Sequence, residues 1–255
     1  MRILLSNDDG VAAPGLAALA EALAGAGELA IVAPADHQSA MAHAITVSDK
    51  LIVVTPGAVA GLPATAVGGT PADSVRLAIR ELLPERPNLV VAGINRGANI
   101  GVNIFYSGTV AAAAEAVFEG IPAVAFSTEV SEGEPDYPAV AACCRRVLDL
   151  LLARGLAAGE LINVNIPFLC PGRPLGVKVV PQSSARVVDT YIARPAPEGH
   201  GAYHISPDYE FLAAPGETDV TALAAGYVTV TPLRMDLTAH DDLKPLAESD
   251  WGDWG

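Results

Sequence analysis

The stretch Arg2-Ile-Leu-Leu-Ser-Asn-Asp-Asp-Gly10 decides the fold, because an apolar run leads directly into two adjacent carboxylates and a glycine. Such a run predicts a buried parallel strand, and the ligands of open α/β sheets bind at the carboxyl ends of their strands. Asp8 and Asp9 would point to opposite faces of a regular strand. They can share one ligand only if the chain leaves strand geometry there, which Gly10 permits.

Two neighbouring carboxylates repel each other, and a hard divalent cation relieves that repulsion. Asp8 and Asp9 therefore indicate a metal site at the end of the first strand. The simpler alternative is a polar turn that begins a helix, and the pair of carboxylates alone does not decide between the two.

Length, hydropathy and charge limit the class of protein. The 255 residues suffice for one large α/β domain or for one domain with an appendage. No apolar run approaches the roughly 20 residues of a membrane span, so no membrane association is expected. A net charge of −14 argues against a nucleic-acid polymer as partner, because such partners need a basic patch. With no disulfide framework and no visible secretory signal, the expected location is the cytoplasm.

Beyond the first strand, apolar runs alternate with helical patterns, which predicts βαβ units and a mainly parallel sheet. Helices are expected over residues 14–26, 71–83, 108–118 and 137–152. Further strands are expected at 28–33, 51–54, 64–67, 89–92, 123–126, 161–166 and 176–180. The α/β core is therefore predicted to span residues 1–181.

The alternation stops after residue 181, which predicts a C-terminal extension at 182–238. Aromatic and apolar residues indicate hairpin strands at Tyr203, Ile205, Tyr209 and Phe211. A capped helix is expected at 218–226, followed by an edge or exchanged strand at 227–231. Because exposed aromatic side chains often cover a partner subunit, the extension is predicted to mediate oligomerisation. Residues 239–255 are expected to form a mobile acidic tail.

A loop serine and a helix start lie near the same predicted edge of the sheet. Ser39 is in the middle of a polar loop that leaves the second strand, where a turn residue bonded to its own backbone is the simpler interpretation. Thr70 and Asp73 form a capping box at the start of the next helix. Capping explains that motif, although the Gly68-Gly69 turn before it could also face a substrate.

The second informative stretch runs from Gly93 to Val110 and holds alternating glycines and asparagines before a strong helix former. Its spacing is neither G-x-G-x-x-G nor a Walker A loop, so dinucleotide and nucleoside-triphosphate motifs are absent. Ser107 is the predicted N-cap of the following helix. The free N–H groups of a first helical turn bind phosphate readily, so Ser107, Gly108 and Thr109 form a candidate phosphate site.

Taken together, several motifs of this chain resemble the SurE family, the stationary-phase survival nucleotidases. The resemblance covers about residues 1–238 in order. The motifs are Ser6-Asn-Asp-Asp-Gly10, Gln38-Ser39, Gly69-Thr-Pro-Ala-Asp73, Gly93-Ile-Asn-Arg-Gly-Ala-Asn99, Tyr106-Ser-Gly-Thr-Val110 and Thr229-Val-Thr-Pro-Leu233.

The resemblance implies a fold and an activity. It implies a Rossmann-like, three-layer α/β core with a C-terminal β-hairpin and strand extension that is exchanged between subunits, in a homodimer or homotetramer. It also implies a metal-dependent phosphomonoesterase acting on nucleoside 5′- and 3′-monophosphates, with exopolyphosphatase activity as a further option.

By position, the resemblance assigns roles to residues of this chain. The implied ligands of one divalent cation per subunit, Mg²⁺ or Mn²⁺, are Asp8, Asp9, Ser39 and Asn95. These oxygen donors suit a hard cation. Asp8, Asp9 and Asn95 are the implied catalytic residues. The implied phosphate ligands are Asn95, Asn99, Ser107, Gly108 and Thr109.

Two other interpretations compete with this one. A haloacid-dehalogenase-type phosphatase needs Asp-x-Asp, but Gly10 stands two residues after Asp8. A non-enzymatic nucleotide- or metal-binding stress protein on the same kind of sheet is the alternative from another functional class. It has no need of an oxygen-ligand metal site beside a phosphate site.

Overall fold

A mixed sheet with nine strands runs through the part of the chain that the computed structural model describes, which is residues 1–47, 51–131, 133–206, 210–212 and 216–252. The order across the sheet is β3-β4-β2-β1-β5-β6-β7-β13-β8. In that order the strands span Val54–Val59, Leu62–Val67, Glu28–Pro34, Arg2–Ser6, Leu89–Arg96, Ala123–Thr128, Leu161–Ile166, Val228–Leu233 and Val177–Val179. All neighbours from β4 to β7 are parallel, as the alternating sequence pattern predicts.

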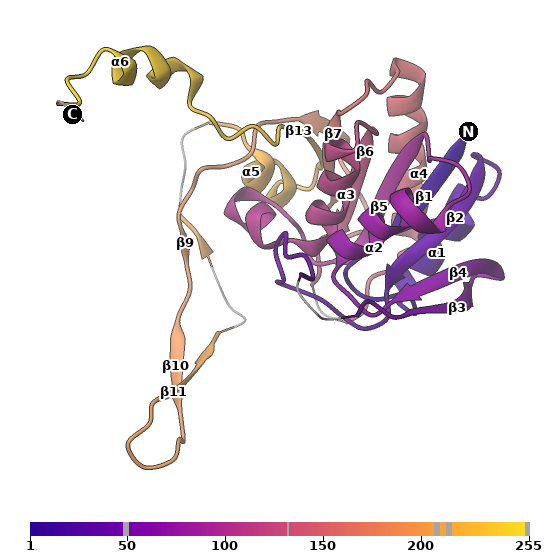
Figure 1. Ribbon diagram of the computed structural model, residues 1–255, viewed down its shortest axis with the longest axis horizontal. Helices are drawn as coiled ribbons and strands as arrows, with labels where there is room; N and C mark the ends of the chain where they lie inside the picture. Colours follow the sequence, from indigo (N-terminus) through magenta and orange to yellow (C-terminus); the bar gives the residue numbers. More distant parts are fainter. Residues whose placement is uncertain (48–50, 132, 207–209, 213–215, 253–255) are drawn as a thin grey trace.

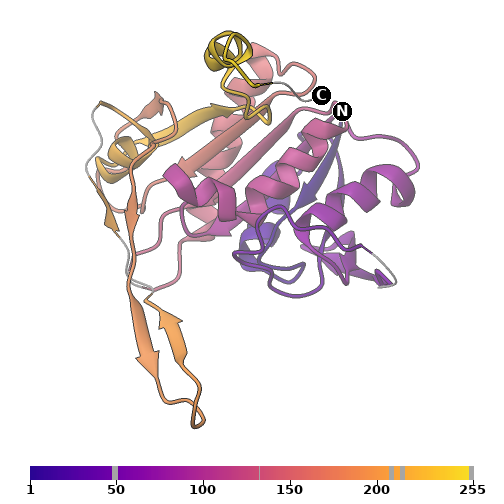
Figure 2. The same ribbon diagram turned by 60° about the vertical axis from the view of Figure 1, so that its left-hand side comes forward.

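Helices cover both faces of this sheet, which confirms the predicted three-layer α/β architecture (Figure 1 and Figure 2). One face carries α1 and α4 and the other carries α2 and α3, with the bounds Pro14–Leu23, Tyr137–Arg154, Pro71–Leu77 and Gly108–Phe118. Successive residues of a strand point to opposite faces. Ile3 and Leu5 of β1 therefore pack into the core under α1 and α4, whereas Leu4 packs into the core under α2 and α3.

The strand β13 differs from the sequence-based expectation of an edge or exchanged strand. It lies inside the chain's own sheet, antiparallel to β7 and parallel to β8, so the edge prediction was wrong. Its alternating threonines suggest a half-exposed strand, but Thr229 and Thr231 are buried and lie opposite Asn165 and Asn163. The domain boundary at residue 181 stays a prediction, although β13 joins both sides of it in one sheet.

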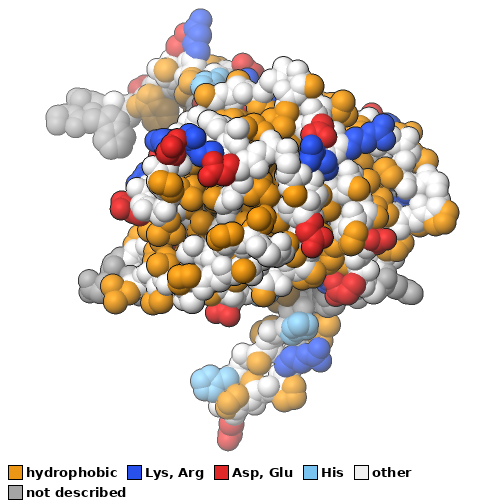
Figure 3. Space-filling model, turned by 90° about the vertical axis from the view of Figure 1, so that its right-hand side faces the viewer, with side chains coloured by type: hydrophobic (Ala, Val, Ile, Leu, Met, Phe, Trp, Pro, Cys, Tyr) orange, Lys and Arg blue, Asp and Glu red, His pale blue; other side chains and the backbone are white. Residues whose placement is uncertain are grey.

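The described residues at 182–206, 210–212 and 216–217 leave the sheet and include a hairpin arm that stands clear of the main body (Figure 1 and Figure 3). The short strands β9, β10, β11 and β12 span Val187–Val188, Tyr191–Arg194, Ala202–Ile205 and Glu210–Phe211. β10 pairs with β11 and β9 with β12, which confirms the hairpin strands predicted around Tyr203, Ile205 and Phe211, whereas Tyr209 lies outside the described residues. Tyr203 is 70% exposed, and exchange of the arm between subunits stays a prediction.

The chain after the arm begins with α5, Asp219–Ala224, which confirms the predicted capped helix because Thr218 and Thr221 form a capping box. After β13, the acidic tail contains the short η3 His240–Asp242 and α6 Leu243–Ala247, whose residues are exposed. Figure 1 places this segment away from the sheet. Its predicted mobility remains a prediction.

Several boundaries differ from those predicted, most clearly at β3 and α2. The strand expected at 51–54 is instead β3, which begins at Val54, while residues 48–50 lie outside the described part. β3 contains Pro56 and Gly57, which obscure a strand in the sequence but are tolerated at the edge of a sheet. The helix α2 ends at Leu77 and continues as the π-helical η1, Ala78–Leu82.

A search for membrane-spanning segments over the described residues finds no helix of sufficient length and apolar character.

Candidate active site

A small pocket at the carboxyl edge of the sheet brings together five of the predicted site residues: Asp8, Ser39, Asn95, Asn99 and Ser107. We call it the rim pocket; its volume is about 210 Å³, and Asn103 and Tyr106 also line it. Asp9, Gly108 and Thr109 are predicted site residues that do not line it. They contact its walls instead, as described below.

Asp8 lies in a bend after β1, so the chain leaves strand geometry where the sequence requires it. Its side chain is buried, and the Thr109 hydroxyl donates a hydrogen bond to Asp8 Oδ1. Burial raises the pKa of Asp8 to about 6, and the charge of Asp9 adds to this effect, whereas the Thr109 hydrogen bond lowers it. A buried carboxylate with a raised pKa is one that a nearby cation would stabilise in its charged form.

Asp9 lies beside Asp8 and is held by the neighbouring loop. The backbone N–H of Arg96 donates to Asp9 Oδ2 at 3.1 Å, and His37 Nδ1 lies 3.4 Å from Asp9 Oδ1. Burial raises the pKa of Asp9 as well, against the opposite effect of the Arg96 N–H. Burial therefore disfavours the charged form of both neighbouring carboxyl groups.

Asn95 reaches the rim pocket because β5 is irregular before it. The pairing of β5 with β6 shifts register between Ala92 and Asn95, and such irregularities turn side chains toward a site. Gly93 allows the close approach, because a Cβ there would lie 2.3 Å from the Phe126 carbonyl oxygen. Asn95 Nδ2 donates to the Gly97 carbonyl at 2.6 Å, which leaves Oδ1 as the atom that can bind a cation.

Ser39 belongs to residues 35–47, the described loop after β2, which we call the Ser39 loop. The Gln38 N–H donates to the Asp8 carbonyl at 2.7 Å, and the Ala42 N–H donates to the Tyr106 carbonyl at 3.1 Å. These two bonds on either side of Ser39 hold the loop against the pocket. The Ser39 hydroxyl is the fourth oxygen donor of the predicted metal site.

The start of α3 also reaches the rim pocket, through Ser107. Ser107 is the N-cap, as predicted, and its hydroxyl accepts from the Val110 N–H at 3.1 Å. A Cβ at Gly108 would lie only 2.7 Å from the Asp8 Cβ. Glycine at this position therefore lets the start of α3 approach the carboxylate, which places helix N–H groups next to a buried acidic side chain.

A network of buried amides positions Asn99. This network was not predicted from the sequence. Asn99 Nδ2 donates to Ser127 Oγ at 2.8 Å, and the Asn99 N–H donates to Asn165 Oδ1 at 2.8 Å. Asn163 and Asn165 both donate to the Asn99 carbonyl. The signal was present as Asn163-Val-Asn165 in an otherwise apolar strand, since two buried amides on one face need polar partners.

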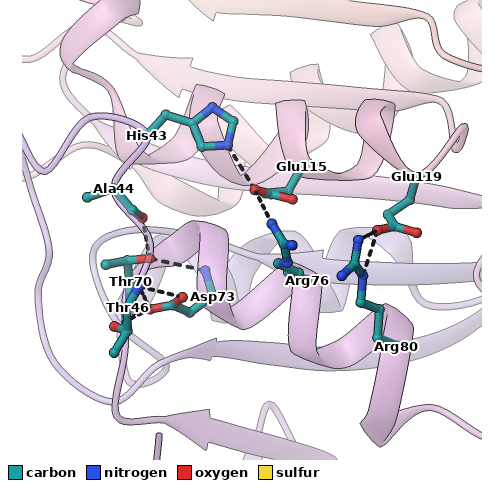
Figure 4. A network of polar contacts seen from close by, with 9 residues as sticks. All are labelled: His43, Ala44, Thr46, Thr70, Asp73, Arg76, Arg80, Glu115 and Glu119. Carbon is teal, nitrogen blue, oxygen red and sulfur yellow. Dashed lines mark hydrogen bonds and ion pairs between the residues drawn. The ribbon is translucent and has the colours of Figure 1, made fainter. Parts of the chain in front are cut away.

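The start of α2 is built differently from that of α3 (Figure 4). Thr70 and Asp73 form the predicted capping box, and Asp73 also accepts bonds from the N–H and the hydroxyl of Thr46. The Thr70 hydroxyl donates to the Ala44 carbonyl at 2.7 Å. These polar groups bind one another, so the structure assigns this motif to capping and loop attachment and not to a substrate.

The predicted donor set, in the rim pocket and beside it at Asp9, fits a hard divalent cation. Two carboxylates, a hydroxyl and an amide oxygen come from Asp8, Asp9, Ser39 and Asn95, and such donors suit Mg²⁺ or Mn²⁺. Over the described residues, no group of three His, Cys, Asp or Glu side chains could hold a metal ion. A zinc-type site is therefore not indicated within that part of the chain.

A larger pocket adjoins the rim pocket, and we call it the outer pocket. The two share Ala40, Asn103 and Tyr106. Its volume is about 960 Å³, and it is also lined by residues at the base of the arm, among them Ser183, Arg186 and Tyr191. A ligand with one end in the rim pocket can therefore extend toward the arm.

Comparisons with known proteins agree with this geometry. The family model described as Survival protein SurE matches residues 3–189. A 5′-nucleotidase SurE of Moorella thermoacetica is 42% identical over 250 residues, covering 97% of this chain and 95% of the relative. A 5′-nucleotidase SurE of Symbiobacterium thermophilum is 44% identical over 252 residues, covering 96% and 97%. The crystal structure of the SurE protein from Aquifex aeolicus matches with a TM-score of 0.83 at 35% identity, covering 96% of this chain and 98% of that one.

Proposed function

The chain belongs to the SurE family, and we propose that it is a metal-dependent 5′-nucleotidase whose rim pocket holds both a divalent cation and the substrate phosphate. One observation supports this most strongly. The buried carboxylate of Asp8 lies directly against the first turn of α3, so a cation site and a phosphate site meet at one point. A phosphomonoesterase needs this combination, since the cation and the helix N-terminus both act on the same phosphoryl group.

Asp8, Asp9, Ser39 and Asn95 would hold one Mg²⁺ or Mn²⁺ ion per subunit. Four protein oxygens leave about two positions of an octahedron for water and a phosphate oxygen. The raised pKa of Asp8 and of Asp9 supports this assignment, because a bound cation would offset the charge that burial penalises.

The bound metal supplies Lewis acidity that polarises the phosphoryl group and activates the attacking water. The chain's own groups do the rest of the chemistry. The N–H groups at the start of α3, with Ser107, Gly108 and Thr109, bind the phosphate oxygens and stabilise the charge that develops on them. Asn95 and Asn99 orient the phosphoryl group. Asp8 or Asp9 would accept the proton of the attacking water as its oxygen bonds to phosphorus. The ester bond breaks, and the leaving nucleoside oxygen takes up a proton from solvent.

We place the nucleoside in the outer pocket, because that pocket is continuous with the rim pocket at Tyr106. Tyr106 and Phe105 are 58% and 53% exposed there and offer faces on which a base can stack. The substrates proposed are nucleoside 5′-monophosphates and also 3′-monophosphates. Short polyphosphates are a further substrate class to assay, since they need only the phosphate and metal sites.

The proposal also includes the assembly and its location. Residues 182–238 would form the contact of a homodimer or homotetramer, supported by the exposed tyrosines of the arm. A cytoplasmic location is supported by the three free cysteines, Cys143, Cys144 and Cys170. Neither a membrane nor a nucleic-acid polymer is among the proposed partners, given the net charge of −14.

Phosphate release tests the proposed activity. Nucleoside 5′- and 3′-monophosphates would be incubated with the purified protein and with Asp9→Asn, in the presence of EDTA, Mg²⁺ or Mn²⁺. We expect release that requires metal and is lost in the variant. Metal binding without release from any substrate would favour a non-enzymatic nucleotide- or metal-binding protein, which the similarity to named nucleotidases does not favour.

A further inference from the structure

The Ser39 loop holds its shape against an unfavourable backbone conformation. Ala40 and Ala42, which follow Ser39 closely, have φ angles of 58° and 53°, in the left-handed region that disfavours residues with a side chain. Such conformations persist only where the surroundings fix them. The contacts that fasten the loop therefore decide whether Ser39 stays at the rim pocket.

One of these contacts joins the loop to the body of α3. His43 Nε2 lies 3.2 Å from Glu115 Oε1 (Figure 4). The imidazole ring of His43 also stacks on Phe118, with 5.4 Å between ring centroids. Because a carboxylate only accepts hydrogen bonds, His43 is the donor. Glu115 and Phe118, one turn apart on α3, thus both contact the side chain of His43.

Glu115 is an unusual residue at its position. It is 4% exposed and lies in the middle of the alanine-rich helix α3, where nothing in helix formation calls for an acid. A buried carboxylate is costly unless it is paired. Its contacts are His43 and, at 3.8 Å, the Arg76 guanidinium of α2. Arg76 offsets the charge from the neighbouring helix, and His43 provides the connection to the loop.

We propose that Glu115 and His43 are positioning residues that fix the Ser39 loop to α3, and thereby hold the serine hydroxyl at the metal site. The inference rests on the proposed function, because it assumes that Ser39 is a metal ligand. α3 then has two tasks, since its N-terminus binds the phosphate while its second turn sets the position of the loop. Groups that orient a ligand without touching the metal typically change metal affinity by about tenfold or more.

Calorimetric titration of the full-length protein with MnCl₂ tests the inference without depending on turnover. We expect Glu115→Ala and His43→Ala each to weaken Mn²⁺ binding by about tenfold. The double variant should bind no more weakly than the weaker single variant, because both changes break one contact. Glu115→Gln keeps an accepting oxygen and should bind Mn²⁺ nearly as the wild type does.

The chain offers a matched control. Glu119 lies on the same side of α3, one turn further along, and pairs with Arg80 at 2.5 Å, but it does not contact the Ser39 loop (Figure 4). Glu119→Gln should leave Mn²⁺ affinity unchanged. A parallel assay should show that the Glu115→Ala defect in kcat disappears at saturating Mn²⁺, which a general loss of folding would not produce.

The outcomes separate the inference from the function on which it rests. If Asp9→Asn abolishes Mn²⁺ binding while both alanine variants bind like the wild type, the positioning role is wrong and the metal site stands. If the wild type binds no Mn²⁺, or Asp9→Asn binds it equally well, the metal site itself is wrong and the inference is overturned with it. His43 is partly exposed, so His43→Ala gives an interpretable result even if Glu115→Ala does not fold.

Discussion

The helices α2 and α3 lie side by side on one face of the sheet, yet their N-termini are used in opposite ways. At α2, the helix supplies its own anion, because Asp73 accepts from the Thr70 N–H and from Thr46. At α3, the cap is the uncharged Ser107, and its first turn contains no acidic residue. The N-terminus of α2 is therefore occupied by the carboxylate of Asp73, whereas the N-terminus of α3 has no carboxylate of its own and lies beside Asp8.

This difference shows how a helix start can be interpreted from its neighbours. Both termini carry the partial positive charge of a helix dipole and would attract an anion. At the terminus without an internal carboxylate, an anionic ligand would meet no like charge from the helix itself. A capping box therefore argues for a structural role, and a neutral cap next to a metal-binding side chain argues for a phosphate site.

The largest expected effect is a loss of activity in Asp8→Asn that Asp73→Asn does not share. Asp8→Asn should lower kcat by at least about 1000-fold, because the charge of a metal ligand is lost at constant size. Its unfolding temperature should not fall, since burial already disfavours the carboxylate. Asp73→Asn should do the reverse and leave kcat near that of the wild type while costing about 1–2 kcal/mol of stability. Kinetics and thermal unfolding of both variants would check this. Equal activity in the two variants would mean that Asp8 and Asp73 do not differ in their role in catalysis.

A second prediction concerns the contact between α3 and Asp8. Gly108→Ala introduces a methyl group that would lie 2.7 Å from the Asp8 Cβ, so the helix start must move away. We expect kcat/KM to fall by about 100-fold, as for other displacements near 1 Å in an active site. Gly57→Ala in β3, where the added carbon would lie 4.0 Å from the Ala64 carbonyl oxygen, controls for the addition of a methyl group away from the site. Unchanged kinetics for Gly108→Ala would mean that this approach is unnecessary.

The third prediction compares the two capping hydroxyls. Ser107→Ala and Thr70→Ala should each destabilise the protein by about 1 kcal/mol, the usual cost of a lost N-cap. Only Ser107→Ala should also raise KM for nucleoside monophosphates, by several-fold, because Ser107 lines the rim pocket. Denaturant titration gives the first quantity and initial rates give the second. A similar rise of KM in Thr70→Ala would show that α2 is not closed to the substrate.

The smallest expected effect is a dependence of stability on pH at the N-terminus of α2. Burial alone would raise the pKa of Asp73, but hydrogen bonds from Thr46 and Thr70 lower it below 3.8. The unfolded chain then binds the proton more readily, so Asp73 stabilises the fold above its ordinary pKa, and this contribution disappears as the pH falls through the folded pKa. Between about pH 5 and pH 3, the wild type should lose more stability than Asp73→Asn. If the free energies of unfolding of the two proteins fell by the same amount over this pH range, the prediction would be wrong.

Features that depend on local sequence were predictable. The buried first strand, the Ser107 cap and the Thr70–Asp73 capping box are each encoded within a few residues, and the structure has all three. The convergence of Asp8, Asn95 and Ser107 was also predictable, since the ends of neighbouring parallel strands meet at one edge.

Features that depend on distant partners were not predictable in this way. Thr229 and Thr231 of β13 are buried because β7 and β8 flank this strand, and these neighbours come from distant parts of the sequence. Asn99 is fixed by side chains 64 and 66 residues away, which no spacing rule connects to it. Likewise, the contact between His43 and Glu115 spans 72 residues and joins a loop to a helix.

The position of β13 has a consequence for how this protein is synthesised. While the ribosome is still translating the arm, β7 has been released with one edge unpaired, and β8 has no strand beside it, because β13 pairs with both. An open strand edge on a nascent chain invites pairing with other chains. A translation stop within the arm would therefore remove more than the arm itself: it would leave the sheet unfinished beyond β7 and the product exposed to aggregation and proteolysis.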